Sequence, residues 1–356
     1  MMHNEKIELL CKQVMSGDAP CYIFGTTPYA ADIARHINVA GFIDDFSSAE
    51  TFHDLPVIKL SAVPEAAIVV SGIVDGRPVT VNRLLEGRKL NHLDYFSFKK
   101  YAGLPLRPLK HGLHEDFKDN YLQHRKKFDQ AYQLLADELS RETFSRLINF
   151  RLTEDIHELE HFEFRLKEIY FEPWINLPEQ DAVFVDVGCF DGDTTLDFIR
   201  RYPSYRSVHL FEPEPGQMEA IKTRLNGVRN IHYHQCGTSN ARSSLRFTSS
   251  GSWSHLDENG DIVVEVDTLD AKVTEKTSFI KMDVEGHEYA TLEGARLHII
   301  NDHPTLAISA YHLVNDFWKL PELVFSIRSD YKLYMRHYTE GVLETVYYFI
   351  PEKEAR

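Results

Sequence analysis

Cysteine and long apolar runs are scarce in this sequence, and each scarcity argues against a class of protein. The four cysteines among 356 residues form no C-x-x-C pair and no metal-ligand spacing, so reduced thiols are expected rather than a disulfide framework. No apolar run approaches the ~20 residues that a membrane-spanning helix needs, and no signal peptide opens the chain. We therefore expect a cytoplasmic protein with no membrane partner.

Positive charge is also in short supply. The chain has 39 lysines and arginines against 54 aspartates and glutamates, which gives a formal net charge of −15. Such a balance disfavours a polyanionic partner, and we expect no nucleic acid to bind. The length is enough for roughly two domains, each with a core of its own.

One stretch combines a strand, a glycine turn and a helix start. Residues 183–187 are mostly β-branched or aromatic, which is typical of a strand buried on both faces of a parallel sheet. The helix that follows is predicted to be capped by Asp193 or Thr194. Between them, Gly188 and Gly192 form a turn at the carboxyl end of the strand, where open α/β sheets hold the polar end of a ligand.

The turn identifies the kind of ligand. Its G-x-x-x-G spacing lacks the third glycine of the dinucleotide fingerprint, G-x-G-x-x-G. Three carboxylates surround it, and they would repel a pyrophosphate but attract a sulfonium and an ammonium. The sequence therefore predicts S-adenosylmethionine rather than NAD. The residues predicted to bind it here are Asp186, Gly188, Cys189, Phe190, Asp191 and Gly192, with Asp193 as the third carboxylate.

The next two predicted strands complete the cofactor site. Residues 207–211 end in Glu212 and Pro213, and an acid at the end of the second strand typically binds ribose hydroxyls. Residues 231–235 predict the third strand, and Cys236 and Gly237 follow at the end where the adenine would lie in this fold.

Four sequence blocks follow one another along residues 181–310. They are Phe184 to Gly188, Phe211-Glu212-Pro213, Val266 to Asp270, and Phe279 to Glu288 continuing to Leu292-Glu293-Gly294-Ala295. In this order they resemble the FkbM-type S-adenosylmethionine-dependent methyltransferases. The resemblance implies a class I methyltransferase fold, a parallel Rossmann-like sheet that ends in an antiparallel hairpin, and methylation of a hydroxyl, most often on a sugar or secondary metabolite.

The candidates for catalysis follow the fourth and fifth predicted strands. Asp283 ends the strand next to the cofactor turn, and His312 follows the strand at 305–309. Removal of the acceptor's proton assists methyl transfer, and histidine is a natural proton acceptor near neutral pH. We therefore predict Asp283 and His312 as the catalytic residues. A divalent metal held by Asp283, Glu285 and His312 is compatible with the sequence, but no ligand spacing requires it.

Other features were interpreted as structural. His287 and Glu288 open a predicted helix, where capping and solvation explain them better than chemistry. Residues 243–266 predict a β insertion in which Trp253 either stacks on a substrate or anchors a hairpin.

The predicted α/β fold divides into three consecutive segments. Residues 1–105 resemble a small Rossmann-like domain, with strands at 21–25, 40–45 and 67–72. Residues 106–178 lack glycine after Gly112 and have apolar residues at helical spacing, which predicts a helical connector. Residues 179–356 form the predicted methyltransferase domain.

Two functions from different classes remain open. The first is an S-adenosylmethionine-dependent O-methyltransferase acting on a small-molecule or glycan hydroxyl. The alternative is a non-catalytic regulatory protein that binds a nucleotide or nucleotide-sugar in its N-terminal half and keeps a degenerate methyltransferase domain. Asp44 and Asp45, after the second strand of that half, either hold a ribose or simply end the strand. A homodimer formed through the N-terminal half is a further expectation. The intact set Asp186, Gly188, Gly192 and Glu212 favours the enzyme.

Overall fold

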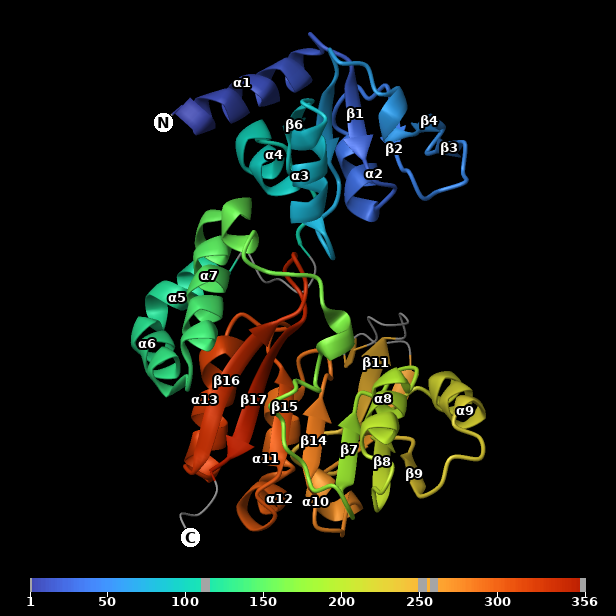
Figure 1. Ribbon diagram of the computed structural model, residues 1–356, viewed down its shortest axis with the longest axis vertical. Coiled ribbons are helices and arrows are strands. Elements are labelled where there is room, and N and C mark those ends of the chain that lie inside the picture. Colours follow the sequence, from blue (N-terminus) through green and yellow to red (C-terminus); the bar gives the residue numbers. More distant parts are fainter. Residues whose placement is uncertain (1, 110–115, 249–254, 257–261, 353–356) are drawn as a thin grey trace. The chain divides into compact units, whose positions relative to one another are not determined.

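The computed structural model describes residues 2–109, 116–248, 255–256 and 262–352 (Figure 1). The chain forms two compact units, each assembled from separate stretches of sequence. The first comprises Met1–Lys118, Ser145–Leu166 and His337–Leu343, and the second Asp119–Phe144, Lys167–Arg336 and Glu344–Arg356. The predicted connector is therefore shared between the two units. No helix among the described residues is long and apolar enough to cross a membrane.

The first unit is the predicted Rossmann-like α/β domain. Its six-stranded sheet has the order β3-β4-β2-β1-β5-β6, and only the β3–β4 pair is antiparallel. The strands are β1 (Cys21–Phe24), β2 (Gly41–Ile43), β3 (Thr51–Phe52), β4 (Leu55–Ile58), β5 (Ile68–Ser71) and β6 (Asn91–Leu93). The helices are α1 (Met2–Ser16), α2 (Pro28–Ala34), α3 (Pro78–Gly87) and α4 (Tyr95–Ala102).

A short segment from near the C-terminus completes this unit. Within His337–Leu343, the buried Glu340 carboxylate accepts hydrogen bonds from the backbone N–H and the hydroxyl of Thr80, both at 2.6 Å. Thr80 lies in the first turn of α3, whose N-terminal residue Arg77 makes no side-chain cap. Glu340 therefore satisfies a helix N-terminus that the local sequence leaves uncapped.

The connector is helical only in its first part. Helices α5 (Phe117–Gln123), α6 (Arg125–Leu134) and α7 (Glu138–Thr153) agree with the prediction. The helical spacing at residues 156–169 was misleading, because this stretch forms two short 3-10 turns, Ile156–Leu159 and Leu166–Glu168. Glu154, at φ 54°, takes a left-handed conformation that ends α7, so the helix cannot continue.

The second unit has the predicted class I methyltransferase sheet. Its seven strands have the order β16-β17-β15-β14-β7-β8-β9, and β17 lies antiparallel to β15, as the predicted terminal hairpin requires. The strands are β7 (Val183–Val187), β8 (Ser207–Phe211), β9 (Ile231–His234), β14 (Phe279–Met282), β15 (Thr305–Ser309), β16 (Tyr331–His337) and β17 (Thr345–Pro351).

Helices lie against this sheet, as Figure 1 shows. They are α8 (Asp193–Arg201), α9 (Pro215–Arg224), α10 (Leu269–Lys272), α11 (Glu288–Glu293), α12 (Arg296–Asn301) and α13 (Asp316–Ile327). The predicted β insertion is a second sheet with the order β10-β13-β11-β12, formed by β10 (Gly237–Thr238), β11 (Ser243–Thr248), β12 (His255–Leu256) and β13 (Ile262–Asp267). Trp253 lies outside the described residues.

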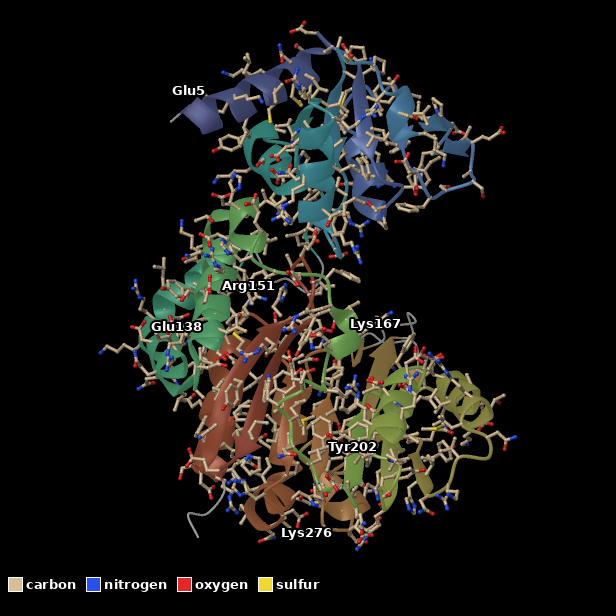
Figure 2. The ribbon with its side chains drawn as sticks, viewed as in Figure 1. Glu5, Glu138, Arg151, Lys167, Tyr202 and Lys276 are labelled. Atoms are coloured by element: carbon tan, nitrogen blue, oxygen red, sulfur yellow. The ribbon has the colours of Figure 1, made fainter. Side chains whose placement is uncertain are left out.

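Aromatic rings form the core beneath the glycine turn. Phe184 of β7 stacks on Phe198 of α8 and on Phe279 of β14, with ring centres 4.5 and 5.2 Å apart. Tyr202, labelled in Figure 2, extends the stack from Phe198 at 5.2 Å. All five residues of β7 are buried, so packing in the core fixes the position where the glycine turn begins.

Candidate functional site

The glycine turn after β7 has no room for a side chain at its first glycine. Gly188 has φ 73°, and a Cβ atom there would lie 1.8 Å from the carbonyl oxygen of Asp283. The N–H groups of Gly188 and Cys189 donate to the Phe211 carbonyl at 3.1 and 3.3 Å, which ties the turn to β8. The predicted cap of α8 by Asp193 or Thr194 is wrong, because Gly192, in the left-handed conformation at φ 81°, is the N-cap residue.

A buried ion pair lies beneath the turn. The Lys281 ammonium is 3.2 Å from Asp186 Oδ1 and donates to the Gly188 carbonyl at 2.6 Å. The Thr195 hydroxyl donates to Asp186 Oδ2 at 2.8 Å. Burial alone would lower the pKa of Lys281, but the carboxylates of Asp186 and Asp283 raise it above its ordinary value. Asp186 therefore lies under the turn, and Lys281 links its carboxylate to the backbone carbonyl of Gly188.

The rim of the turn is less negative than the sequence suggested. Arg224 of α9 forms ion pairs with Asp191, at 2.8 Å, and with Asp193. Phe190, at φ 44°, leaves 41% of its surface exposed at the same rim. The Cys189 thiol is buried, and this burial raises its pKa well above the ordinary value, so it is an unreactive packing group.

The second and third strands end in the other predicted cofactor residues. Glu212 is only 7% exposed, and it accepts the N–H of Glu214 at 2.9 Å. Burial raises its pKa to about 7, although the N–H of Glu214 and the charge of Lys281 act in the opposite direction. Pro213 follows it and lies close to Gly237, where an added Cβ would contact the proline ring at 3.9 Å.

A cavity of about 300 Å³ opens at the end of β9. Cys236 is among the residues that line it, and Lys272 lies 3.4 Å from Asp267 in the same lining. The full lining is Tyr233, His234, Gln235, Cys236, Arg242, Glu265, Val266, Asp267 and Lys272.

Asp283 is held by hydroxyl groups on both of its oxygens. Tyr170 donates to Oδ2 at 2.9 Å, and Tyr311 donates to Oδ1 at 3.3 Å. The Tyr170 backbone N–H is in turn fixed by the hydroxyl of Tyr348, at 3.0 Å. Burial would raise the pKa of Asp283, but Lys281 and His312 lower it below its ordinary value. The carboxylate is therefore ionised, oriented, and still 25% exposed.

His312 lies among carboxylates and is almost completely buried. Its Nδ1 bonds Glu288 Oε1 at 2.8 Å, and its Nε2 lies 3.4 Å from Asp283 Oδ1 and 3.6 Å from Glu285 Oε2. Burial would lower its pKa, but Glu288, Asp283 and Glu285 together raise it to about 10. The ring is therefore an imidazolium at neutral pH.

Glu288 is not the solvated residue that its helix-start position suggested. It is fully buried, and its carboxylate also accepts the N–H groups of Val284, at 2.9 Å, and Gly286, at 3.1 Å. The ligand atoms of Asp283, Glu288 and His312 lie within 4.8 Å of one another, close enough to surround a metal ion. With His312 protonated, however, the imidazolium already supplies the positive charge of this cluster.

Several residues of the site escaped the sequence-based prediction, Tyr170, Glu344 and Lys281 among them. Tyr170 lies in the connector, far from Asp283 along the chain, and nothing local marks it. Glu344 precedes β17, and its pKa is raised to about 8, by burial and then by Asp283. Lys281 did leave a signal, because it is a charged residue inside the apolar strand Phe279–Met282.

In the first unit, Asp44 and Asp45 were candidates to bind a ribose, but both carboxylates accept hydrogen bonds from nearby groups of the protein. Asp44 accepts the Thr26 hydroxyl at 2.8 Å and the N–H groups of Phe46 and Ser47, both at 2.9 Å. Asp45 accepts the N–H of Leu60 at 2.8 Å. These bonds give both carboxylates a structural role in their loop.

Comparisons with known proteins bear on both the domain and the fold. Residues 186–339 match the family described as the methyltransferase FkbM domain. No curated protein matches the sequence. Among solved structures, a methyltransferase FkbM from Methylobacillus flagellatus has a TM-score of 0.74 at 24% identity, and the match covers 97% of this chain and 93% of that one. That similarity extends the shared fold over both units.

Two further solved structures match only half of the chain. An rRNA methylase from Streptococcus thermophilus has a TM-score of 0.34 at 17% identity, covering 50% of this chain and 90% of that one. Aeropyrum pernix fibrillarin, in complex with S-adenosyl-L-methionine, has a TM-score of 0.33 at 13% identity, covering 49% and 70%. Scores this low carry no argument about the present chain.

Proposed function

Because the protein carries a methyltransferase domain of the FkbM family over residues 186–339, we propose that it transfers a methyl group from S-adenosylmethionine to a hydroxyl group of a sugar, glycan or secondary metabolite. The observation that carries this proposal is the position of Asp283. Its backbone carbonyl lies against Gly188 of the cofactor turn, while its carboxylate stays partly exposed and fixed by two tyrosines.

The cofactor is proposed to bind along the ends of β7, β8 and β9. Gly188 allows the methionine portion to approach the backbone, and the buried Glu212 would accept hydrogen bonds from the ribose hydroxyls. Cys236 and Gly237, next to the cavity after β9, would contact the adenine. When bound, S-adenosylmethionine supplies an electrophilic methyl group on a positively charged sulfur.

Asp283 is proposed to receive the proton of the acceptor hydroxyl. A hydroxyl oxygen becomes strongly acidic as its new bond to carbon forms, so a carboxylate with a lowered pKa suffices as the base. His312 was a candidate base in the sequence, but its raised pKa means that it already carries a proton. We assign it the role of a positioning residue, whose positive charge keeps Asp283 ionised.

The cofactor is tested by thermal denaturation of the full chain. S-adenosylhomocysteine at ~100 times its dissociation constant should add ~2.7 kcal/mol of stability and raise the melting temperature. NADH should leave it unchanged. A shift with NADH and none with S-adenosylhomocysteine would contradict the proposal.

Methyl transfer is tested with methyl-labelled S-adenosylmethionine and a panel of sugars and polyols. Asp283→Asn should lower turnover by ~10²–10⁴, the usual contribution of a general base. Asp181→Asn is the matched control, because Asp181 is 70% exposed and pairs only loosely with Arg206, at 3.7 Å. Wild-type turnover in Asp283→Asn would eliminate the assigned base. Loss of turnover in EDTA, restored by magnesium, would show that a metal ion acts in its place.

A further inference from the structure

Histidines gather on the two outermost strands at one end of the methyltransferase sheet. His209 of β8 and His232 of β9 are partners in the parallel register, and their rings stack with centres 4.6 Å apart. The His234 ring lies 5.4 Å from that of His209, nearly parallel to it. β9 is the last strand of the sheet, so this cluster lies at a sheet edge.

A carboxylate from another element joins the cluster. Glu275 lies between α10 and β14, beside Lys276, which is labelled in Figure 2. Its Oε2 is 2.9 Å from His209 Nε2 and accepts the Ser207 hydroxyl at 2.8 Å. His209, His232 and Glu275 each offer one ligand atom, and these atoms all lie within 4.8 Å of one another.

This donor set has the composition of a transition-metal site. Imidazole nitrogens and carboxylate oxygens are ligands that zinc and other first-row transition metals prefer. In a tetrahedral site with metal–ligand bonds of ~2.0–2.2 Å, two ligand atoms lie ~3.3–3.5 Å apart. The 2.9 Å separation of His209 Nε2 from Glu275 Oε2 is within a few tenths of an ångström of that spacing. The His209 and His232 rings are nearly parallel, at 13°, so the exposed His232 ring must turn for both histidines to face one ion.

The surroundings also fit the pattern of a metal site. Ligand histidines usually bond a partner through their second ring nitrogen, which fixes the ring. Here His209 Nδ1 lies 3.1 Å from His234 Nε2, and Ser207 holds the carboxylate of Glu275. His209 is buried, whereas His232 is exposed, so an ion could enter from solvent.

We propose that His209, His232 and Glu275 bind a divalent transition-metal ion of the zinc class, and that this ion fastens β9 to the segment before β14. Among the described strands, the edge strand β9 pairs with one neighbour, β8. The inference is independent of the acceptor and of the methyl-transfer chemistry.

The test is a zinc titration of the full chain after EDTA treatment and removal of the chelator. Isothermal calorimetry should show one equivalent of zinc bound by the wild type. His232→Asn and Glu275→Gln should each weaken binding at least about tenfold. His53→Asn is the control, because His53 is an exposed histidine in the first unit and its φ of 48° suits asparagine. It should bind zinc as the wild type does.

Amide hydrogen exchange gives a second readout that does not depend on activity. Zinc should slow exchange in Ile231–His234 of the wild type and leave exchange in His232→Asn unchanged. Absence of stoichiometric binding in the wild type, or unchanged affinity in both ligand variants, would overturn the site. Zinc binding without slower exchange in β9 would overturn the fastening role.

Discussion

Replacing Lys281 by methionine tests the ion pair beneath the glycine turn. Methionine fills a similar volume without the ammonium, which in the native protein lies 3.2 Å from Asp186 Oδ1 and 2.6 Å from the Gly188 carbonyl. Asp186 is fully buried, and the Thr195 hydroxyl would still donate a hydrogen bond to its carboxylate. Removing one partner of a buried pair costs roughly 3–5 kcal/mol, because the remaining charge is uncompensated.

The expected loss has a characteristic pH dependence. In Lys281→Met the buried carboxylate of Asp186 faces no cation, and the cost of burying an unpaired carboxyl charge is smaller at low pH, where carboxyl groups bind protons. The loss of stability should therefore grow as pH rises. Lys281→Met should therefore be closest to wild-type stability near pH 5 and furthest from it near pH 8.

The assay is urea denaturation followed by circular dichroism, in a double-mutant cycle. Lys281→Met with Asp186→Asn removes both charges and should be more stable than Lys281→Met alone. Lys276→Met is the control, because Lys276 is exposed, and it should change stability by no more than about 0.5 kcal/mol. A loss below ~1 kcal/mol in Lys281→Met, or a double variant no more stable than it, would refute the reasoning.

Three further predictions concern other buried carboxylates and His312. Glu212 has a pKa of about 7, and a ribose would bond its ionised form, so the affinity for S-adenosylhomocysteine measured by calorimetry should rise from pH 6 to 8. Glu212→Gln should abolish this pH dependence and weaken binding by ~1–3 kcal/mol. The pKa of His312 is about 10 in the folded protein and 6.5 ordinarily, so the stability that its charge contributes is complete below pH 6.5 and is lost as pH rises towards 10. His312→Gln should lower the melting temperature, and the melting temperature of this variant should fall less between pH 6.5 and 10 than that of the wild type. Glu340→Gln keeps one acceptor for Thr80 but loses the negative charge at the start of α3. It should lower the free energy of unfolding of the first unit, measured in urea, by ~0.5–1 kcal/mol. An unchanged urea midpoint would argue against the cap.

The sequence predicted those parts of the site that depend on neighbours along the chain. Strand β7 is an uninterrupted buried run, and Gly188 and Glu212 end consecutive strands, so the local pattern was sufficient to locate them. The parallel sheet that ends in an antiparallel hairpin followed from the resemblance, and the structure confirms it. Asp283 was located by the same reasoning, as an acid at the end of β14.

Contacts between distant segments were beyond the reach of that reasoning. Tyr170 bonds Asp283, and Glu340 bonds Thr80, across long stretches of chain whose folding no local periodicity encodes. Glu288 was misinterpreted for the same reason. Its position at a helix start suggested solvent, but His312 and two backbone N–H groups surround it in the folded chain. Helical spacing at 156–169 failed because a single left-handed residue, Glu154, ends α7.

The strand register explains why the glycine turn and Asp283 lie together. In the pairing of β14 with β7, Lys281 lies opposite Asp186 and Met282 lies opposite Val187. The next residue on each strand is then Asp283 and Gly188, which places the Asp283 carbonyl where only glycine can face it. Lys281 consequently lies between two carboxylates, that of Asp186 under the turn and that of Asp283, which Tyr170 and Tyr311 fix. A register slip of one residue would separate these charges and turn the side chains of one strand to the opposite face, so the two sequence motifs can function only together.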